Sequence, residues 1–352
     1  MLQRFCFCVF PRSVSFAVSG RRLSLTRPRV EVCSSSPSDA SFQRSLALLE
    51  QERVSDALAV LGEAVAAHPS DVRLFALRAS CFERLGRLDE ALFDHQMAVR
   101  LLPASPPARL ALAECLRQLG RPEEAQRTIE HLLGTVGEQY TPALVALGEL
   151  MLESDHLERA VEIFQKAAKC GKEIDPPAAL SGLAQSLLRL ERLDECEQVL
   201  RKLLKTSPDD ARDWSALGNV LYQKERYQEA VDAFARAVEI GGDTEYHIQR
   251  AAALLQLRKP DEALVDLNYV AQEDPNGEGM HITHLMLGLA HYAKTDLTNA
   301  AKHFEEWLRN PNQNEEDPHQ VHSILLKLAE CTTDEKKAAA ILQKANSVKQ
   351  KQ

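Results

Sequence analysis

Apolar and polar residues follow one another along most of the chain at helical spacing, in short blocks separated by polar turns. The stretch WSALGNVLYQKERYQEAVDAFARAVEI, from Trp214 to Ile240, contains two such blocks around one turn. Its second block places Ala230, Phe234 and Ala237 three or four residues apart, as one face of a helix requires. The pattern predicts two amphipathic helices joined as a hairpin, called helix A and helix B below.

This hairpin pattern returns at a nearly constant interval. A small residue preceded by polar or acidic residues opens each B helix, at Ala57, Ala91, Ala125, Ala160, Cys196, Ala230, Ala263 and Ala300. The successive spacings are 34, 34, 35, 36, 34, 33 and 37 residues, which defines eight units. Because one hairpin cannot bury its own apolar stripe, we expect the units to stack into one array.

The unit at residues 211–244 resembles a tetratricopeptide repeat, whose pattern is W-x2-L-G-x2-Y…A-x3-F…P. It matches that pattern at Trp214, Leu217, Gly218, Ala230 and Phe234, and departs from it at Leu221 and Gly242. The other units share parts of the pattern in phase. The resemblance implies an all-α fold, a right-handed superhelical solenoid of antiparallel helix pairs.

Three regions are predicted on this basis. Residues 1–37 are a disordered tail or transit peptide, residues 38–310 hold eight repeats, and residues 311–352 hold a linker and two capping helices. The Lys- and Gln-rich end of the chain is typical of the solvated cap that a repeat array needs. Within a repeat, we expect a small residue of helix A, such as Gly218, to face the Ala that opens helix B.

Charge is distributed unevenly. The net charge is −9, but the first 37 residues contain six Arg and a single acid, Glu31, so they carry +5 and the remainder carries −14. An acidic body argues against a nucleic-acid partner, which would require a basic stripe. No apolar run reaches the roughly 18 residues of a membrane span, so no integral membrane association is predicted.

The basic, Ser-rich N-terminal segment has the composition of an organellar presequence. We therefore predict a mitochondrial protein, with a cytoplasmic one carrying a disordered N-terminus as the alternative. A plastid or secretory signal fits less well, because Pro11 interrupts the short apolar core from Phe5 to Phe10. Whether the segment is cleaved stays open.

The sequence contains few candidate catalytic or metal-binding residues. Its eight Cys form no CxxC pair, and Cys81 and Cys115 fall at equivalent helix-A positions where small residues pack, which favours structural thiols. The pairs His281/His284 and His319/His322 could share a helix face, but no further ligand completes a zinc site. No nucleotide, hydrolase or metalloprotease motif is present. We predict no enzyme, cofactor or metal site, and leave metal binding by these His open.

In the family that the chain resembles, helix A lines a concave groove with its second, fifth, ninth and twelfth positions. For units two to four this implies the charged set Arg73, Ser80, Glu83, Glu114, Arg117 and Glu149. For units six to eight it implies a largely apolar and aromatic set: Arg212, Ser215, Asn219, Tyr222, Ile248, Leu255, Ile282, Leu285, Leu289 and Tyr292. Some of these side chains could instead pack between the units.

The function predicted from this resemblance is a non-enzymatic scaffold or adaptor that holds a partner protein or peptide in the groove. Assembly, import or quality control of mitochondrial complexes is the expected setting. A cytosolic adaptor or co-chaperone is the first alternative. It would lack the carboxylate clamp of chaperone adaptors, because clamp positions that hold Lys, Asn and Arg in those proteins hold Ser215, Gln249, Ile282 and Met286 here. A self-associating structural array is the second. The partner and the oligomeric state are not legible from the sequence.

Overall fold

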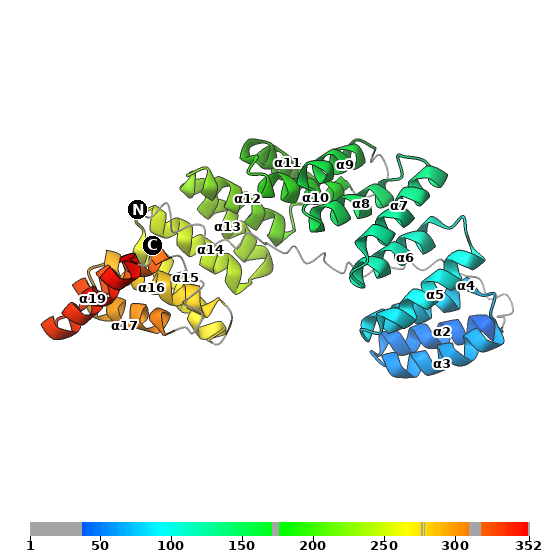
Figure 1. Cartoon of the computed structure of the whole chain (residues 1–352), viewed down its shortest axis with the longest axis horizontal. Helices are drawn as coiled ribbons and strands as arrows, with labels where there is room; N and C mark the ends of the chain where they lie inside the picture. Colours follow the sequence, from blue (N-terminus) through cyan, green and yellow to red (C-terminus); the bar gives the residue numbers. More distant parts are fainter. Residues whose placement is uncertain (1–36, 171–175, 276, 278, 310–317, 351–352) are drawn as a thin grey trace. The chain divides into compact units, whose positions relative to one another are not determined.

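The computed structural model of this chain describes residues 37–170, 176–275, 277, 279–309 and 318–350 (Figure 1). These residues form eighteen α-helices, α2 to α19, and no strand, which confirms the all-α class. The disordered-tail or transit-peptide prediction for residues 1–37 lies outside the described part, except for Pro37, which begins α2. The helices divide between two compact units, residues 37–190 and residues 191–350, called the N-terminal and C-terminal units below.

The N-terminal unit contains nine helices: α2 (Pro37–Glu50), α3 (Val54–Ala67), α4 (Val72–Arg84), α5 (Leu88–Leu101), α6 (Pro106–Gln118), α7 (Pro122–Val136), α8 (Thr141–Glu153), α9 (Leu157–Cys170) and α10 (Pro176–Arg189). Helices α2/α3, α4/α5, α6/α7 and α8/α9 pack as consecutive hairpins, and each B helix also contacts the next A helix. This is the arrangement predicted for stacked repeats.

The C-terminal unit contains the other nine: α11 (Leu193–Thr206), α12 (Ala211–Gln223), α13 (Tyr227–Gly241), α14 (Thr244–Gln256), α15 (Pro260–Glu273), α16 (Met280–Ala293), α17 (Leu297–Leu308), α18 (Pro318–Cys331) and α19 (Glu335–Gln350). Helices α18 and α19 form the predicted terminal pair. They close a core built from Phe304, Trp307, Ile324 and Leu325. Within the described ranges, no helix is both long and apolar enough to cross a membrane.

The small residues that define the period lie at the centre of the helix pairs. All eight, from Ala57 to Ala300, are at most 1 % exposed. A residue with a left-handed backbone stands five positions before each of them: Glu52, Gly86, Gly120, Asp155, Glu191, Glu225, Arg258 and Thr295, with φ between 57° and 70°. Only two of the eight are Gly, so six turns hold a side chain in a backbone region that disfavours it.

The close contact between helices A and B differs from the expectation. A Cβ added at Gly218 would lie 2.5 Å from the Phe234 ring, and Gly148 and Gly288 face the equivalent rings of helix B in the same way. The nearest atoms therefore belong to a phenylalanine rather than to the Ala that opens the helix. The glycine makes room for an aromatic ring, which fills the space that a smaller residue would leave empty.

Candidate partner-binding face

The ten predicted groove residues all lie in the C-terminal unit, on the successive A helices α12, α14 and α16 (Figure 1). Helices α13, α15 and α17 pack against them as their hairpin partners. Helix α12 also contacts α14, and α14 contacts α16. The side of these three helices that carries the predicted residues is called the A-helix face below.

Side-chain hydrogen bonds join neighbouring helices across this face. The Ser215 hydroxyl on α12 donates to Oε1 of Gln249 on α14 over 2.6 Å. Gln256, two turns further along α14, donates from Nε2 to the Tyr222 hydroxyl over 3.0 Å. Both pairs join residues 34 positions apart, one repeat period. Because both bonds join α12 to α14, they hold these two A helices at a fixed spacing.

The structure divides the ten predicted residues into two groups. Five are buried between helices: Ser215, Asn219, Tyr222, Ile248 and Leu285. Five stay partly exposed: Arg212, Leu255, Ile282, Leu289 and Tyr292. Burial of the first group means that those side chains set the spacing of the helices. The partly exposed apolar side chains are the ones that a partner could touch directly.

Asn219 occupies an unusual position in the first group. Its side chain is 3 % exposed, and its Oδ1 has no hydrogen-bond partner within the described part of the chain. Leaving a buried acceptor without a donor costs on the order of 1–3 kcal/mol. It lies one turn from Ser215 and from Tyr222, whose polar groups are hydrogen-bonded. Asn219 is thus the place on the A-helix face where one hydrogen bond is missing.

The two ends of the face carry charge. At one end, Arg212 bonds Asp210, and the Glu245 carboxylate accepts from Gln249 Nε2 over 3.1 Å. Burial raises the pKa of Glu245, and the neighbouring Asp243 adds to this effect. At the other end, Tyr292 donates to Glu330 on α18, and this bond together with burial raises the tyrosine pKa to about 12. Acceptors therefore flank the apolar part.

Several C-terminal His residues contact neighbouring rings or the backbone. His281 stacks on Trp307, whereas His284 approaches His303 with 3.1 Å between their Nδ1 atoms. Burial, with the neighbouring His284 and His291, lowers the pKa of His303 to about 4. His322 bonds the backbone carbonyl of Ala345.

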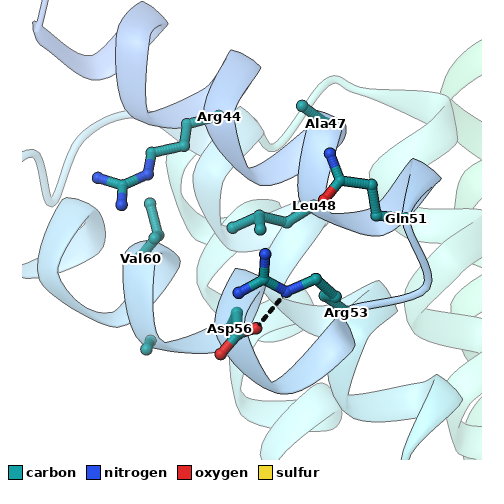
Figure 2. Close-up of a pocket in the computed structure, with 8 residues that line it drawn as sticks. Arg44, Ala47, Leu48, Gln51, Arg53, Asp56 and Val60 are labelled. Atoms are coloured by element: carbon teal, nitrogen blue, oxygen red, sulfur yellow. Dashed lines mark hydrogen bonds and ion pairs between the residues drawn. The ribbon is translucent and has the colours of Figure 1, made fainter.

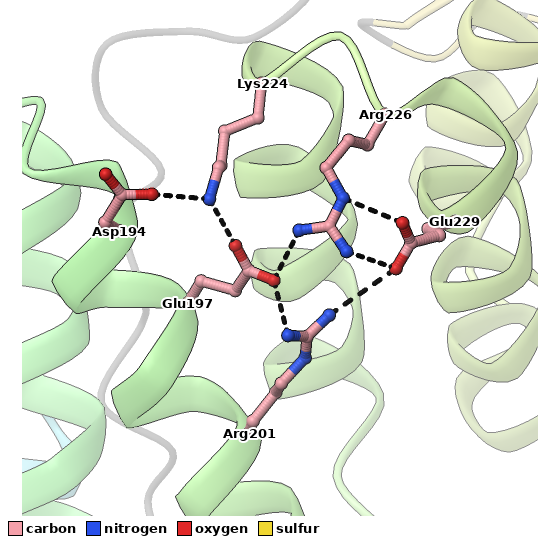
Figure 3. Close-up of polar contacts among 6 residues, drawn as sticks. All are labelled: Asp194, Glu197, Arg201, Lys224, Arg226 and Glu229. Atoms are coloured by element: carbon pink, nitrogen blue, oxygen red, sulfur yellow. Dashed lines mark hydrogen bonds and ion pairs between the residues drawn. The ribbon is translucent and has the colours of Figure 1, made fainter.

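A dense ion-pair network joins α11 to the turn between α12 and α13 (Figure 3). Glu197, only 6 % exposed, accepts from Lys224 at 2.5 Å and from Arg226 at 2.6 Å, and also pairs with Arg201 at 2.6 Å. Burial alone would raise the pKa of Glu197, but the hydrogen bonds from Lys224 and Arg226 outweigh it and lower the pKa. The pattern search missed this network, which occupies an edge of the repeats and not the A-helix face.

The charged set predicted for units two to four lies in the N-terminal unit. Arg117 on α6 bonds Glu114 at 2.5 Å and also contacts Glu153 of α8. Glu149 lies one turn before Glu153, and its pKa is raised to about 7. Burial is the main cause. The positive charge of Arg117 lowers this pKa, and the negative charges of Glu114 and Glu153 raise it. Of these carboxylates, Glu149 alone sits where its charge is poorly compensated.

The first hairpin bears a hollow of about 520 Å³ on the outer side of α2 and α3 (Figure 2). Its wall combines the apolar side chains of Leu48 and Val60 with Arg44, Gln51 and an ion pair, Arg53–Asp56, of 2.6 Å. None of these residues was predicted as a site. The hollow is shallow and mostly exposed, and it brings together no catalytic set of groups.

Comparison with known proteins identifies one family. A tetratricopeptide repeat model matches residues 42–106, 181–245 and 248–315, and a second tetratricopeptide repeat model matches residues 86–138. The human Protein O-mannosyl-transferase TMTC1 is 26 % identical over 181 residues, 49 % of this chain and 20 % of that protein. Mouse Anaphase-promoting complex subunit 7 is 23 % identical over 229 residues, 65 % of this chain and 40 % of that protein. The chain thus spans less than half of these relatives.

Solved structures share the fold. A tetratricopeptide repeat protein from Parabacteroides merdae superimposes with a TM-score of 0.53 at 17 % identity, covering 72 % of this chain and 98 % of that one. Yeast Tom70 superimposes with a TM-score of 0.52 at 16 % identity, covering 99 % of this chain and 69 % of that one. At this level of identity the likeness describes helix arrangement and says nothing of a shared ligand.

Proposed function

Because this chain belongs to the tetratricopeptide repeat family, we propose that it is a non-enzymatic scaffold that holds an extended segment of a partner protein on the A-helix face. The observation that carries the proposal is the composition of that face. Leu255, Ile282 and Leu289 are partly exposed on this face, and the polar side chains of Ser215, Tyr222, Gln249 and Gln256 are already hydrogen-bonded between α12 and α14. Such a face suits apolar side chains presented on a polar backbone.

Preorganisation supports this assignment. A partner that binds to ordered helices does not have to immobilise their side chains, so less of the binding energy is lost. Asn219 supports it further, because its Oδ1 on this face is an acceptor without a donor. The acceptors Glu245 and Glu330 at the two ends favour a segment with donors or positive charge at its ends.

The test compares two sets of substitutions in the full chain. Leu255→Ala, Ile282→Ala and Leu289→Ala together remove the apolar part of the face. Val265→Ala, Leu297→Ala and Ile240→Ala remove three apolar side chains that are exposed on B helices, with exposed fractions of 70 %, 40 % and 37 %. We expect proximity labelling in cells to lose its main partners with the first set and to keep them with the second.

Circular dichroism and thermal melting establish that both triple variants remain folded. If the first set is folded and still labels the same partners as the unsubstituted chain, the A-helix face is not the binding surface. Sedimentation velocity of the purified chain addresses the alternative of self-association. A concentration-dependent increase in mass that disappears with the first set would make the occupant a second copy of this chain.

The setting of this function is a separate part of the proposal. We infer a mitochondrial location from the six Arg and single acid of residues 1–37, a composition typical of presequences. A fusion of residues 1–40 to a fluorescent protein should label mitochondria. A diffuse cytoplasmic signal would refute the location while leaving the scaffold proposal intact.

A further inference from the structure

Three metal-ligating side chains meet in the N-terminal unit, away from the A-helix face. Glu83 lies in the last turn of α4, His95 in α5 and Cys115 in α6. One carboxylate oxygen, one ring nitrogen and the sulfur lie within 4.8 Å of one another. Over the described ranges, this is the one group of three or more His, Cys, Asp or Glu that gathers so closely.

The three groups are positioned by the repeat architecture. His95 Nε2 and Glu83 Oε1 are 2.8 Å apart, and Cys115 Sγ is 3.6 Å from the backbone oxygen of Leu88. The side chain of His95 is 6 % exposed and Cys115 is fully buried, whereas Glu83 is 28 % exposed. The group is therefore enclosed on the protein side and reachable from solvent past the Glu83 carboxylate.

The electrostatic surroundings favour a cation. Burial, with the negative charges of Glu83, Glu114 and Asp89, raises the pKa of the Cys115 thiol to about 11. The same acidic charges that hold the proton on the thiol would stabilise a divalent ion in its place. Cys81, also fully buried and with its thiol pKa raised to about 11 by burial, lies outside the group.

We propose that Glu83, His95 and Cys115 bind one zinc ion, with a water molecule as the fourth ligand on the exposed side of Glu83. Thiolate, imidazole and carboxylate are the three ligand types that zinc takes in proteins. Bond lengths of roughly 2.0–2.3 Å place tetrahedral ligands about 3.3–3.8 Å apart. The separations that involve Cys115, at most 4.8 Å, therefore need to close by up to about 1 Å, and the 2.8 Å between His95 Nε2 and Glu83 Oε1 needs to widen by about 0.5 Å.

A bound ion would cross-link helices of neighbouring repeats. Its ligands come from both helices of one hairpin and from the first helix of the next, so the ion would join two consecutive repeats. Zinc needs the thiolate, and one proton leaves Cys115 for each ion bound. The apparent affinity should therefore rise with pH.

The experiment uses the full chain without a histidine tag and with Co²⁺ as a spectroscopic substitute for zinc. We expect a thiolate-to-cobalt absorption band that added zinc abolishes. The unsubstituted chain should bind one more Co²⁺ ion per chain than Cys115→Ser. His95→Gln should also bind one Co²⁺ ion fewer. Cys81→Ser is the matched control. It removes an equally buried thiol at the equivalent position of the preceding A helix, α4, and it should bind Co²⁺ like the unsubstituted chain.

A second readout guards against a folding defect. Zinc should raise the melting temperature of the unsubstituted chain and of Cys81→Ser, and leave that of Cys115→Ser unchanged. If Cys115→Ser, folded by circular dichroism, binds as much Co²⁺ as the unsubstituted chain with the same absorption band, the proposal is wrong. The group is then held by hydrogen bonds alone. A pH-independent affinity would equally rule out a thiolate ligand.

Discussion

Glu149 offers a prediction in which the structure sets both sign and size. This carboxylate belongs to α8 and is partly buried, and its pKa is raised to about 7 by burial and by the negative charges of Glu114 and Glu153. In the unfolded chain the pKa returns to the ordinary value of 4.5. We therefore expect Glu149→Gln, which removes the charge and keeps the shape, to stabilise the N-terminal unit.

The direction follows from proton linkage. A carboxyl whose pKa is raised by folding binds its proton more tightly in the folded state, so folding is favoured below pH 4.5 and is penalised as pH rises towards and beyond 7. A shift from 4.5 to about 7 is worth at most about 3 kcal/mol, at 1.36 kcal/mol per unit. Between pH 5 and pH 8, this penalty grows by about 2 kcal/mol in the unsubstituted chain and is absent from the variant.

Native-state hydrogen exchange measures this difference where it arises. Peptides covering α8 and α9 should be protected more in Glu149→Gln than in the unsubstituted chain at pH 8, after correction for the pH dependence of intrinsic exchange. The two chains should be nearly alike at pH 5. A stabilisation of equal size at both pH values would refute the titration argument, since it would then come from packing. No stabilisation at pH 8 would mean that Arg117 or solvent already compensates the charge.

Two further predictions concern the backbone and packing. Gly218→Ala should lower the free energy of unfolding by about 1–3 kcal/mol in urea denaturation, because its Cβ would lie 2.5 Å from the Phe234 ring. The control is Gly62→Ala, whose Cβ would have nothing within 4 Å and which should raise the free energy of unfolding by about 0.5–1 kcal/mol. Equal effects of the two substitutions would contradict the packing explanation. Thr295→Gly should stabilise by about 1 kcal/mol, because Thr295 holds φ at 62° and is β-branched; an unchanged or lower urea midpoint would show that the turn carries no strain.

Much of the fold could be predicted because the repeat pattern is redundant. A small residue, Ala in seven units and Cys in one, recurs eight times, so weak units such as the first are placed by their neighbours' phase. The backbone conformation of the turns could be predicted only in part. Gly86 and Gly120 indicate a left-handed backbone, whereas Glu52 and Arg258 do not. Those residues adopt it because the hairpin geometry of every repeat requires it, which is a tertiary constraint that overrides local preference.

The candidate face was less predictable for a physical reason. The family pattern gives the side of helix A on which a residue lies, and Tyr222 and Leu255 both hold the twelfth position of their helix A. Their exposure nevertheless differs, because Tyr222 is 4 % exposed and bonds Gln256 of the next repeat, whereas Leu255 remains partly exposed. Exposure depends on which side chain the neighbouring repeat presents, and a position count within one repeat does not contain that information.

The same dependence on neighbours explains why the Glu83, His95 and Cys115 group escaped a search by spacing. Its members are 12 and 20 residues apart and share no helix. They meet because successive helices of a stacked array present a fixed register, so distant residues come together once per period. In a repeat protein, contacts that carry chemistry are therefore best sought at separations near one repeat or one hairpin. Ser215–Gln249, at 34 residues, and Arg78–Asp94, at 16, obey this rule. Each contact between neighbouring repeats can therefore gain a hydrogen bond, an ion pair or a metal ion without any change to the residues that build the fold.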